Sequence, residues 1–224
     1  MASIAPPTTR AARARQTRRR MHESARKLFV SQGYSDTTMT QIAEDAGVAV
    51  QTLYYTFQTK GKLLIEIVEV ASAGGDPVPV PQREWFREMM SSTDAQRILA
   101  LGVEHGTGIY ERVAALWPAF AVAVSDPFVA DYWESIAARR RDAQRGQVVR
   151  VSEVGNLKPG LTIEQATDLL FLLAGHAPYR SLVEDAGWPI VEYKSWLFRT
   201  LVQQILDTSI DPSAVADLSF AMMR

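Results

Sequence analysis

The stretch GYSDTTMTQIAEDAGVAVQTLYYTFQTKGKLL, residues 33–64, decides the fold of the N-terminal part of this chain. It contains a threonine followed three residues later by a glutamine, Thr38 and Gln41, which is the spacing of a helix capping box. A short helix is therefore expected over about residues 39–46. Gly47 follows it and supplies the left-handed backbone that ends a helix.

Three further helices surround this one. A second short helix is expected over about residues 50–57, and Thr59 caps a longer helix that begins at Lys60. Upstream, apolar residues recur at helical spacing over residues 21–29, and Gly33 ends that helix. Two helices of about two turns joined by a glycine turn predict a helix-turn-helix, whose second helix can enter the major groove of DNA.

The second short helix has a packed side and an outer side. The spacing of Leu53 and Phe57 assigns both side chains to packing against the other helices. The opposite side is left free for DNA and carries Val50, Gln51, Thr52, Tyr55 and Thr56.

The charges of the chain are divided between a basic head and an acidic body. Residues 1–62 carry 10 Lys and Arg against 4 Asp and Glu, whereas residues 63–224 carry 14 against 21. Six arginines precede the first acidic residue, Glu23. This division favours a polyanionic partner for the head alone, although a solvated basic tail would have the same composition.

An ordered series of short segments fills the basic head: Gly33-Tyr34, Thr37-Thr38-Met39, Ile42-Ala43, Ala46-Gly47-Val48, Thr52-Leu53-Tyr54-Tyr55-Thr56-Phe57 and Lys60-Gly61-Lys62-Leu63-Leu64. With these segments, residues 17–65 resemble the DNA-binding domain of the TetR family of bacterial transcriptional regulators. The resemblance covers about a fifth of the chain. It implies a dimeric regulator, in most cases a repressor, that binds a pseudo-palindromic operator on double-stranded DNA and is released by a small-molecule effector.

The resemblance also implies which residues contact DNA. Thr38 and Lys60, at helix N-termini, are expected to contact phosphates, as is the hydroxyl of Tyr54 or Tyr55. Base reading is expected from the neighbouring positions Thr40, Val50, Gln51 and Thr52, with Thr56 on the same helix.

Two positions depart from the usual pattern of the family. The family often has serine where this chain has Ala49, so the second short helix lacks its usual side-chain cap, at a cost on the order of 1 kcal/mol. It often has a small residue or proline where this chain has Gln51. Because a glutamine can reach base edges, Gln51 is the main candidate for sequence specificity.

Beyond residue 71 the sequence predicts helices joined by short loops, so the whole chain is expected to be all-α. Residues 73–82, with three prolines and two glycines, form the one clear break. Helices are expected at about residues 83–90, 94–115, 117–124, 126–150, 162–185 and 189–207.

Four regions follow from this layout. They are a basic N-terminal arm (1–16), a three-helix helix-turn-helix DNA-binding domain (17–62), a helical-bundle domain for effector binding and dimerisation (63–210) and a C-terminal tail (211–224). The arginines of the arm and of the residues just after it are expected to contact phosphates or the minor groove.

The two C-terminal helices predict a homodimer interface. Residues 169–174 are apolar around the whole helix, and the last helix is nearly as broad, with Phe198 and Leu201 among its apolar residues. A helix that is apolar all round is either central in its own subunit or packed against another molecule. We expect a four-helix interface with two helices from each subunit, and a central position in a monomer is the alternative.

A ligand site in the acidic body is expected from apolar walls interrupted by a few polar groups. Each residue taken alone could equally be ordinary core. The predicted ligand-binding residues are Met89, His105, Trp117, Phe120, Trp133, Phe171 and His176.

Several classes of protein are disfavoured. The chain has no cysteine and three scattered histidines, so neither a metal site nor a cofactor is predicted. It lacks a secretory signal and an apolar stretch long enough to span a membrane, and we expect a cytoplasmic bacterial protein that associates with the nucleoid. An architectural DNA-binding protein without an effector is the first alternative. An enzyme with a basic tail is the second, although no nucleophile elbow, P-loop or paired histidine motif is present.

Overall fold

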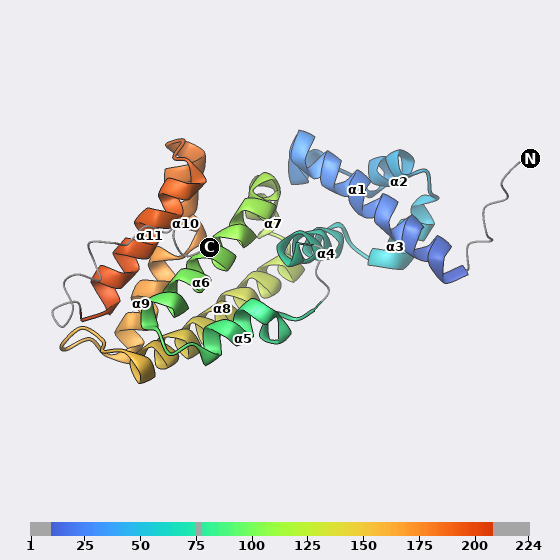
Figure 1. Ribbon diagram of the computed structural model, residues 1–224. Helices are drawn as coiled ribbons and strands as arrows, with labels where there is room; N and C mark the ends of the chain where they lie inside the picture. The colour runs from blue at the N-terminus through green and yellow to red at the C-terminus, as the bar shows by residue number, and fades with distance from the viewer. Residues whose placement is uncertain (1–9, 75–77, 208–224) are drawn as a thin grey trace, which may run out of the picture. The chain divides into compact units, whose positions relative to one another are not determined.

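The computed structural model describes residues 10–74 and 78–207 (Figure 1). Within these ranges the chain is helical and contains no strand, and only an isolated bridge joins Leu157 to Leu206. The predicted all-α class is therefore confirmed. Over the same ranges, no helix combines the length and the hydropathy that crossing a bilayer requires. Residues 1–9 of the predicted arm and the whole predicted tail, 211–224, lie outside the described residues.

The chain forms two compact units, which are described separately. Unit 1 contains the residues up to Ser72 together with Val113–Glu134, and unit 2 contains Ala73–Arg112 and the residues from Ser135 onward. The domain limits expected from the sequence remain predictions, because a packing unit need not coincide with a domain.

Unit 1 is built on a three-helix arrangement that contains the predicted helix-turn-helix. Helix α1 packs against α2 and α7, and α2 packs against α3. The helices of unit 1 are α1 (Arg10–Asp36), α2 (Met39–Ala46), α3 (Val50–Phe57), α4 (Lys60–Ala73), α7 (Trp117–Ala123), preceded by a short 3-10 turn (Ala114–Leu116), and the first part of α8 (Pro127–Val154).

Two features of α1 differ from the sequence prediction. The helix already begins at Arg10, so the described part of the predicted arm is helical rather than a separate extended segment. Gly33 has φ 85° and breaks the regular helix as expected, but one more turn follows it instead of a polar loop. That turn buries Tyr34, and it is closed by a hydrogen bond from the Thr37 hydroxyl to the Gly33 carbonyl, 2.7 Å long.

Unit 2 is a second helical group, in which α9 and α11 lie side by side (Figure 1). Its elements are a short 3-10 turn (Val80–Gln82), α5 (Glu84–Ser91), α6 (Ala95–Val113), the rest of α8, α9 (Ile163–Leu173), α10 (His176–Tyr179), a π-helical segment η3 (Arg180–Asp185) and α11 (Ile190–Ile205).

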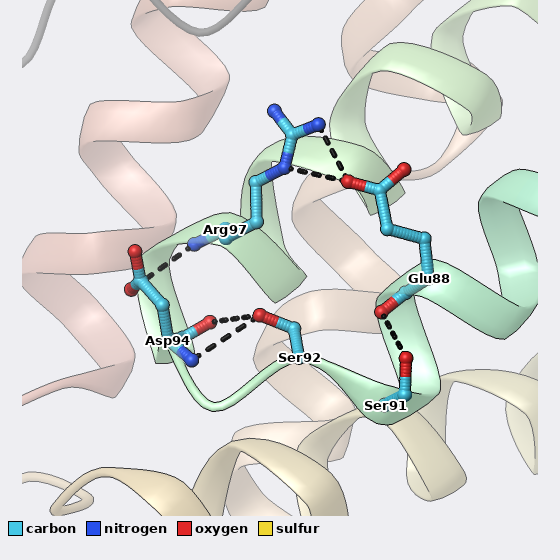
Figure 2. A network of polar contacts seen from close by, with 5 residues as sticks. All are labelled: Glu88, Ser91, Ser92, Asp94 and Arg97. Atoms are coloured by element: carbon cyan, nitrogen blue, oxygen red, sulfur yellow. Dashed lines mark hydrogen bonds and ion pairs between the residues drawn. The ribbon is translucent and has the colours of Figure 1, made fainter.

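Side-chain hydrogen bonds fix the corner between α5 and α6 (Figure 2). Asp94 caps α6 by accepting from the backbone of Gln96 at 2.8 Å, which satisfies one of the free N–H groups of the first turn. Arg97 then reaches back to the Glu88 carboxylate, with N–O distances of 2.7 and 3.0 Å. The direction in which α6 leaves α5 is therefore set by local contacts.

The single helix predicted for residues 162–185 is wrong, because the chain breaks at Gly175. A Cβ atom at this position would lie 3.0 Å from the Leu172 carbonyl oxygen and 3.2 Å from that of Phe171. The guanidinium of Arg140 on α8 binds the carbonyls of Phe171 and Ala174, which the broken helix leaves without an intrahelical partner. The break is thus stabilised by a residue distant in sequence.

The apolar breadth of α11 is used inside unit 2. Phe198 and Leu201 have no exposed surface, so both belong to the core of their own unit. Leu172 on α9 and Val191 on α11 are exposed, at 64% and 49%. Of the two interpretations given to these helices, a central position holds for the buried residues, and only the exposed ones are available to a second copy.

Candidate functional site

The helix-turn-helix in unit 1 is held at both ends of α2. The Thr38 hydroxyl accepts from the backbone of Gln41 at 3.2 Å, and the Gln41 side chain accepts from the backbone of Thr38 at 2.8 Å. This is the predicted capping box. At the other end Gly47 adopts φ 63° and ψ 44°, and its N–H bonds back to α2. The turn between α2 and α3 is therefore defined by local sequence, as expected.

Helix α3 separates packed and exposed residues as predicted. Leu53 and Phe57 are buried in the core of unit 1, and Ala49 provides no side-chain cap. Gln51, Thr52, Tyr54 and Tyr55 are exposed, and Tyr55 is the most open of them at 90%.

The remaining candidate positions are less open or already engaged. Val50 and Thr56 are partly buried, and the Thr56 hydroxyl bonds to the Thr52 carbonyl at 2.8 Å. Thr40 is exposed on α2, and Thr38 is exposed but uses its hydroxyl in the capping box.

Lys60 lies elsewhere than the predicted phosphate contact requires. Its ammonium donates to the carbonyls of Tyr34 at 2.6 Å and Thr37 at 2.8 Å, and lies 4.2 Å from the centre of the Tyr34 ring. Burial lowers the pKa of this group, against the opposing charge of Asp126. Lys60 thus joins α4 to the end of α1, and a phosphate could bind it only in competition with these bonds.

A charged cluster lies behind the C-terminal end of α3. Arg18 on α1 binds both carboxylate oxygens of Glu66 on α4, and the His22 ring nitrogen lies 2.8 Å from the same carboxylate. The Phe57 ring lies 5.0 Å from the Arg18 guanidinium and 5.5 Å from the His22 ring. Burial lowers the pKa of His22, and the charge of Glu66 acts against this effect.

Asp126 connects the start of α8 to the helix-turn-helix within unit 1. It accepts from the backbone of Phe128 at 3.0 Å, which confirms the predicted cap, and from the Tyr34 hydroxyl at 3.2 Å. Gly61 is required beside it, because a Cβ atom there would lie 2.6 Å from the carboxylate. The Lys62 ammonium adds a contact 4.6 Å from the Phe128 ring.

Sequence reasoning missed the roles of Glu66 and Gly61 in these two clusters. Each depends on a partner dozens of positions away, and no local spacing signals such a pairing.

The residues predicted to bind a ligand fall into separate groups. Trp117, Phe120 and Trp133 contact one another in unit 1, with ring centres 5.3–5.7 Å apart. The other four lie in unit 2, where Met89 is buried, the His105 ring stacks on Trp85 at 4.2 Å, the Phe171 ring lies 3.7 Å from the Arg140 guanidinium and the His176 ring lies 5.7 Å from Tyr110.

Sequence comparison identifies the N-terminal part of the chain. Residues 23–67 match the family model described as "Bacterial regulatory proteins, tetR family". Over 54 residues, 24% of this chain, it is 44% identical to the HTH-type transcriptional regulator SrpR of Pseudomonas putida, of which the match covers 25%. It is 43% identical over 54 residues to the uncharacterized HTH-type transcriptional regulator TtgW, also of Pseudomonas putida, of which the match covers 40%. The similarity thus spans less than half of either relative.

Solved structures extend the likeness in fold to most of the chain. NalD, the secondary repressor of the MexAB-OprM multidrug efflux pump in Pseudomonas aeruginosa, superposes with a TM-score of 0.68 at 17% identity, over 88% of this chain and 99% of NalD. SmeT, the repressor of the SmeDEF pump of Stenotrophomonas maltophilia, superposes in its complex with triclosan with a TM-score of 0.66 at 15% identity, over 87% of this chain and 93% of SmeT.

Proposed function

We propose that this chain, a member of the TetR family of bacterial regulatory proteins through its residues 23–67, is a sequence-specific DNA-binding transcriptional regulator. The observation that carries the proposal is the outer face of α3, where Gln51, Thr52 and Tyr55 are exposed on a helix whose opposite side is buried. A helix held in this way presents side chains to base edges in the major groove without rearrangement.

The DNA contacts follow from this placement. Gln51 and Thr52 lie in the first turn of α3 and are assigned to base reading, together with Thr40 on α2. Tyr54 and Tyr55 are assigned to phosphates through their hydroxyl groups. The exposed arginines at the start of α1, such as Arg10 and Arg15, supply a sequence-independent attraction to the duplex.

The regulator is proposed to act as a dimeric repressor in the bacterial cytoplasm. Two copies would place their α3 helices one helical turn of DNA apart on a pseudo-palindromic operator. The exposed apolar residues Leu172 and Val191, on two helices that lie side by side, support an interface on α9 and α11.

Release from DNA is proposed to follow the binding of a small apolar or aromatic effector. The structurally similar SmeT is a repressor solved with triclosan, which supports a ligand-responsive fold of this kind. An effector that binds the released conformation more tightly shifts the population away from DNA binding.

The experiment that tests the function is a selection of duplexes from a random library with the purified full-length protein. A sequence-specific dimer is expected to enrich an inverted repeat and to bind it at least about a thousandfold more tightly than random duplex. Enrichment of no motif, with equal affinity for all duplexes, would instead support an architectural DNA-binding protein.

A further inference from the structure

Unit 2 gathers four rings from three elements. Tyr110 comes from α6, His176 and Tyr179 from α10, and Tyr193 from α11. The ring centres of Tyr110 and Tyr179 lie 5.7 Å apart, and those of Tyr179 and Tyr193 lie 5.6 Å apart. We refer to these four residues as the tyrosine cluster.

Two buried hydroxyl groups of this cluster are in opposite situations. The Tyr110 hydroxyl donates to the Ala174 carbonyl and accepts from Arg140, both at 3.0 Å. The Tyr193 side chain has no exposed surface, and its hydroxyl has no hydrogen-bond partner among the described residues. A buried polar group without a partner is costly, and native proteins commonly satisfy such a group with a molecule from outside the chain.

The charged groups near the cluster are already engaged. Lys194, the neighbour of Tyr193 in sequence, binds Glu104 at 2.9 Å and lies 3.7 Å from Glu111. Arg140 is bonded to Tyr110 and to two backbone carbonyls. Burial lowers the pKa of His176 to about 4, so its ring is neutral at pH 7. The group that is left to be recognised is a neutral phenol.

The backbone around the cluster departs from regular helix twice. The chain breaks at Gly175, directly before His176, and the π-helical segment η3 begins directly after Tyr179. Segments of π-helix are rare and are found frequently at functional sites. This irregular backbone is a second observation, independent of the unsatisfied hydroxyl, and it marks the same place.

We propose that the effector of this regulator binds against the tyrosine cluster and accepts a hydrogen bond from the Tyr193 hydroxyl. The ligand is an uncharged, mainly apolar molecule with one acceptor such as a carbonyl oxygen, and its apolar surface packs on the rings of Tyr179 and Tyr110. The assignment rests on the proposed function only in naming the ligand an effector, since the site itself is defined by unit 2.

The test compares two uncharged fluorescent probes on the full chain. Nile red carries a carbonyl acceptor, whereas diphenylhexatriene is a hydrocarbon without one. In Tyr193→Phe the ring is retained and the hydroxyl is removed, so the affinity for Nile red is expected to fall about tenfold. The affinity for diphenylhexatriene is expected to stay within about twofold of wild type.

Tyr110→Phe is the matched control, because it removes a hydroxyl that the chain itself satisfies. It is expected to lower the midpoint of thermal unfolding while leaving the ratio of the two probe affinities at the wild-type value. Equal Nile red affinity for wild type and Tyr193→Phe would overturn the proposal, as would failure of Nile red to bind the wild-type protein. Both probes are read without DNA, so failure of the DNA-binding function would leave this result unaffected.

Discussion

Gln51 is the residue on which sequence discrimination is expected to depend. It is exposed in the first turn of α3, and a glutamine amide can form two hydrogen bonds with an adenine edge. Gln51→Ala should therefore lower discrimination at one symmetric pair of operator positions by about 1–3 kcal/mol. The measurement is fluorescence anisotropy with a set of operators that differ at single base pairs.

The control for this variant is Gln204→Ala, which makes the same change at an exposed position of α11 in unit 2. It should leave every operator affinity unchanged. Equal weakening of all operators by Gln51→Ala would show that the glutamine contacts the DNA backbone, and base reading would then rest on Thr40 and Thr52.

Lys60 separates a structural role from a role in DNA binding. Lys60→Ala removes two charge-assisted hydrogen bonds to the carbonyls of Tyr34 and Thr37, so the free energy of unfolding should fall by about 2 kcal/mol. The salt dependence of DNA binding should keep its slope, because the ammonium is already occupied. A slope lower by about one unit, with unchanged stability in urea, would restore the phosphate contact implied by the family resemblance.

At the scale of elements, the contact between α4 and the start of α8 depends on Gly61. Gly61→Ala would bring a methyl group to 2.6 Å from the Asp126 carboxylate, and the forced displacement should cost about 1–3 kcal/mol in the free energy of unfolding. Gly146→Ala is the matched control, since its Cβ would meet nothing within 4 Å inside α8. That control should stabilise the protein by up to about 1 kcal/mol, as measured by urea unfolding.

The same pair of elements allows a double-mutant cycle. Asp126→Ala alone should destabilise the protein by about 1 kcal/mol through loss of the cap of α8. Combined with Gly61→Ala it should cost less than the sum of the two single changes, because the clash disappears with the carboxylate. Simple additivity would mean that the two residues do not interact.

The elements that the sequence predicted correctly are those with local determinants. Helices α2 and α3 follow from the capping box at Thr38, the left-handed Gly47 and the spacing of Leu53 and Phe57. The break at Gly175 was missed because its stability depends on Arg140, on another helix. Within a long apolar segment a single glycine is weak evidence for a break, and periodicity favours one continuous helix.

The site was predictable to the same extent. The exposed face of α3 follows from helical periodicity, whereas the contacts of Lys60 do not, since the Tyr34 and Thr37 carbonyls become available only when α1 and α4 pack. For the ligand, aromatic composition pointed to both units at once. The unsatisfied hydroxyl of Tyr193 has no signature in sequence, because hydrogen-bond partners are set by tertiary packing.

At the scale of the whole molecule, the stability of the protein should fall as the pH is lowered from about 6.5 towards 5. Burial lowers the pKa of His22, His105 and His176, the last to about 4. Between the unfolded value near 6.5 and the folded values, the unfolded chain binds more protons, so acidification favours unfolding.

Urea unfolding at several pH values measures this dependence. Each histidine should contribute less than about 1.4 kcal/mol per pH unit, since its ring retains some contact with solvent. His176→Gln should flatten the dependence. A stability that rises on acidification over this range would contradict the assignment of neutral, buried rings.

Assembly is also a property of the whole molecule, and the structure changes the substitutions that can test it. Charges at Phe198 or Leu201 would unfold unit 2, because both residues are in its core. Leu172→Glu instead places a charge on an exposed apolar position and should shift a dimer towards monomers in sedimentation, at a cost of about 1 kcal/mol or more. Val122→Glu, at an exposed position of unit 1, is the control and should sediment as wild type does.

The openness of Tyr55 has a consequence for the thermodynamics of DNA binding. With 90% of the residue exposed in the free protein, a duplex that covers its ring removes a large aromatic surface from water. Burial of apolar surface gives a negative change in heat capacity, whereas contacts with phosphates are registered mainly through the release of counterions. The variation of affinity with temperature therefore reports on the aromatic face of α3, independently of the charges that the variation with salt records.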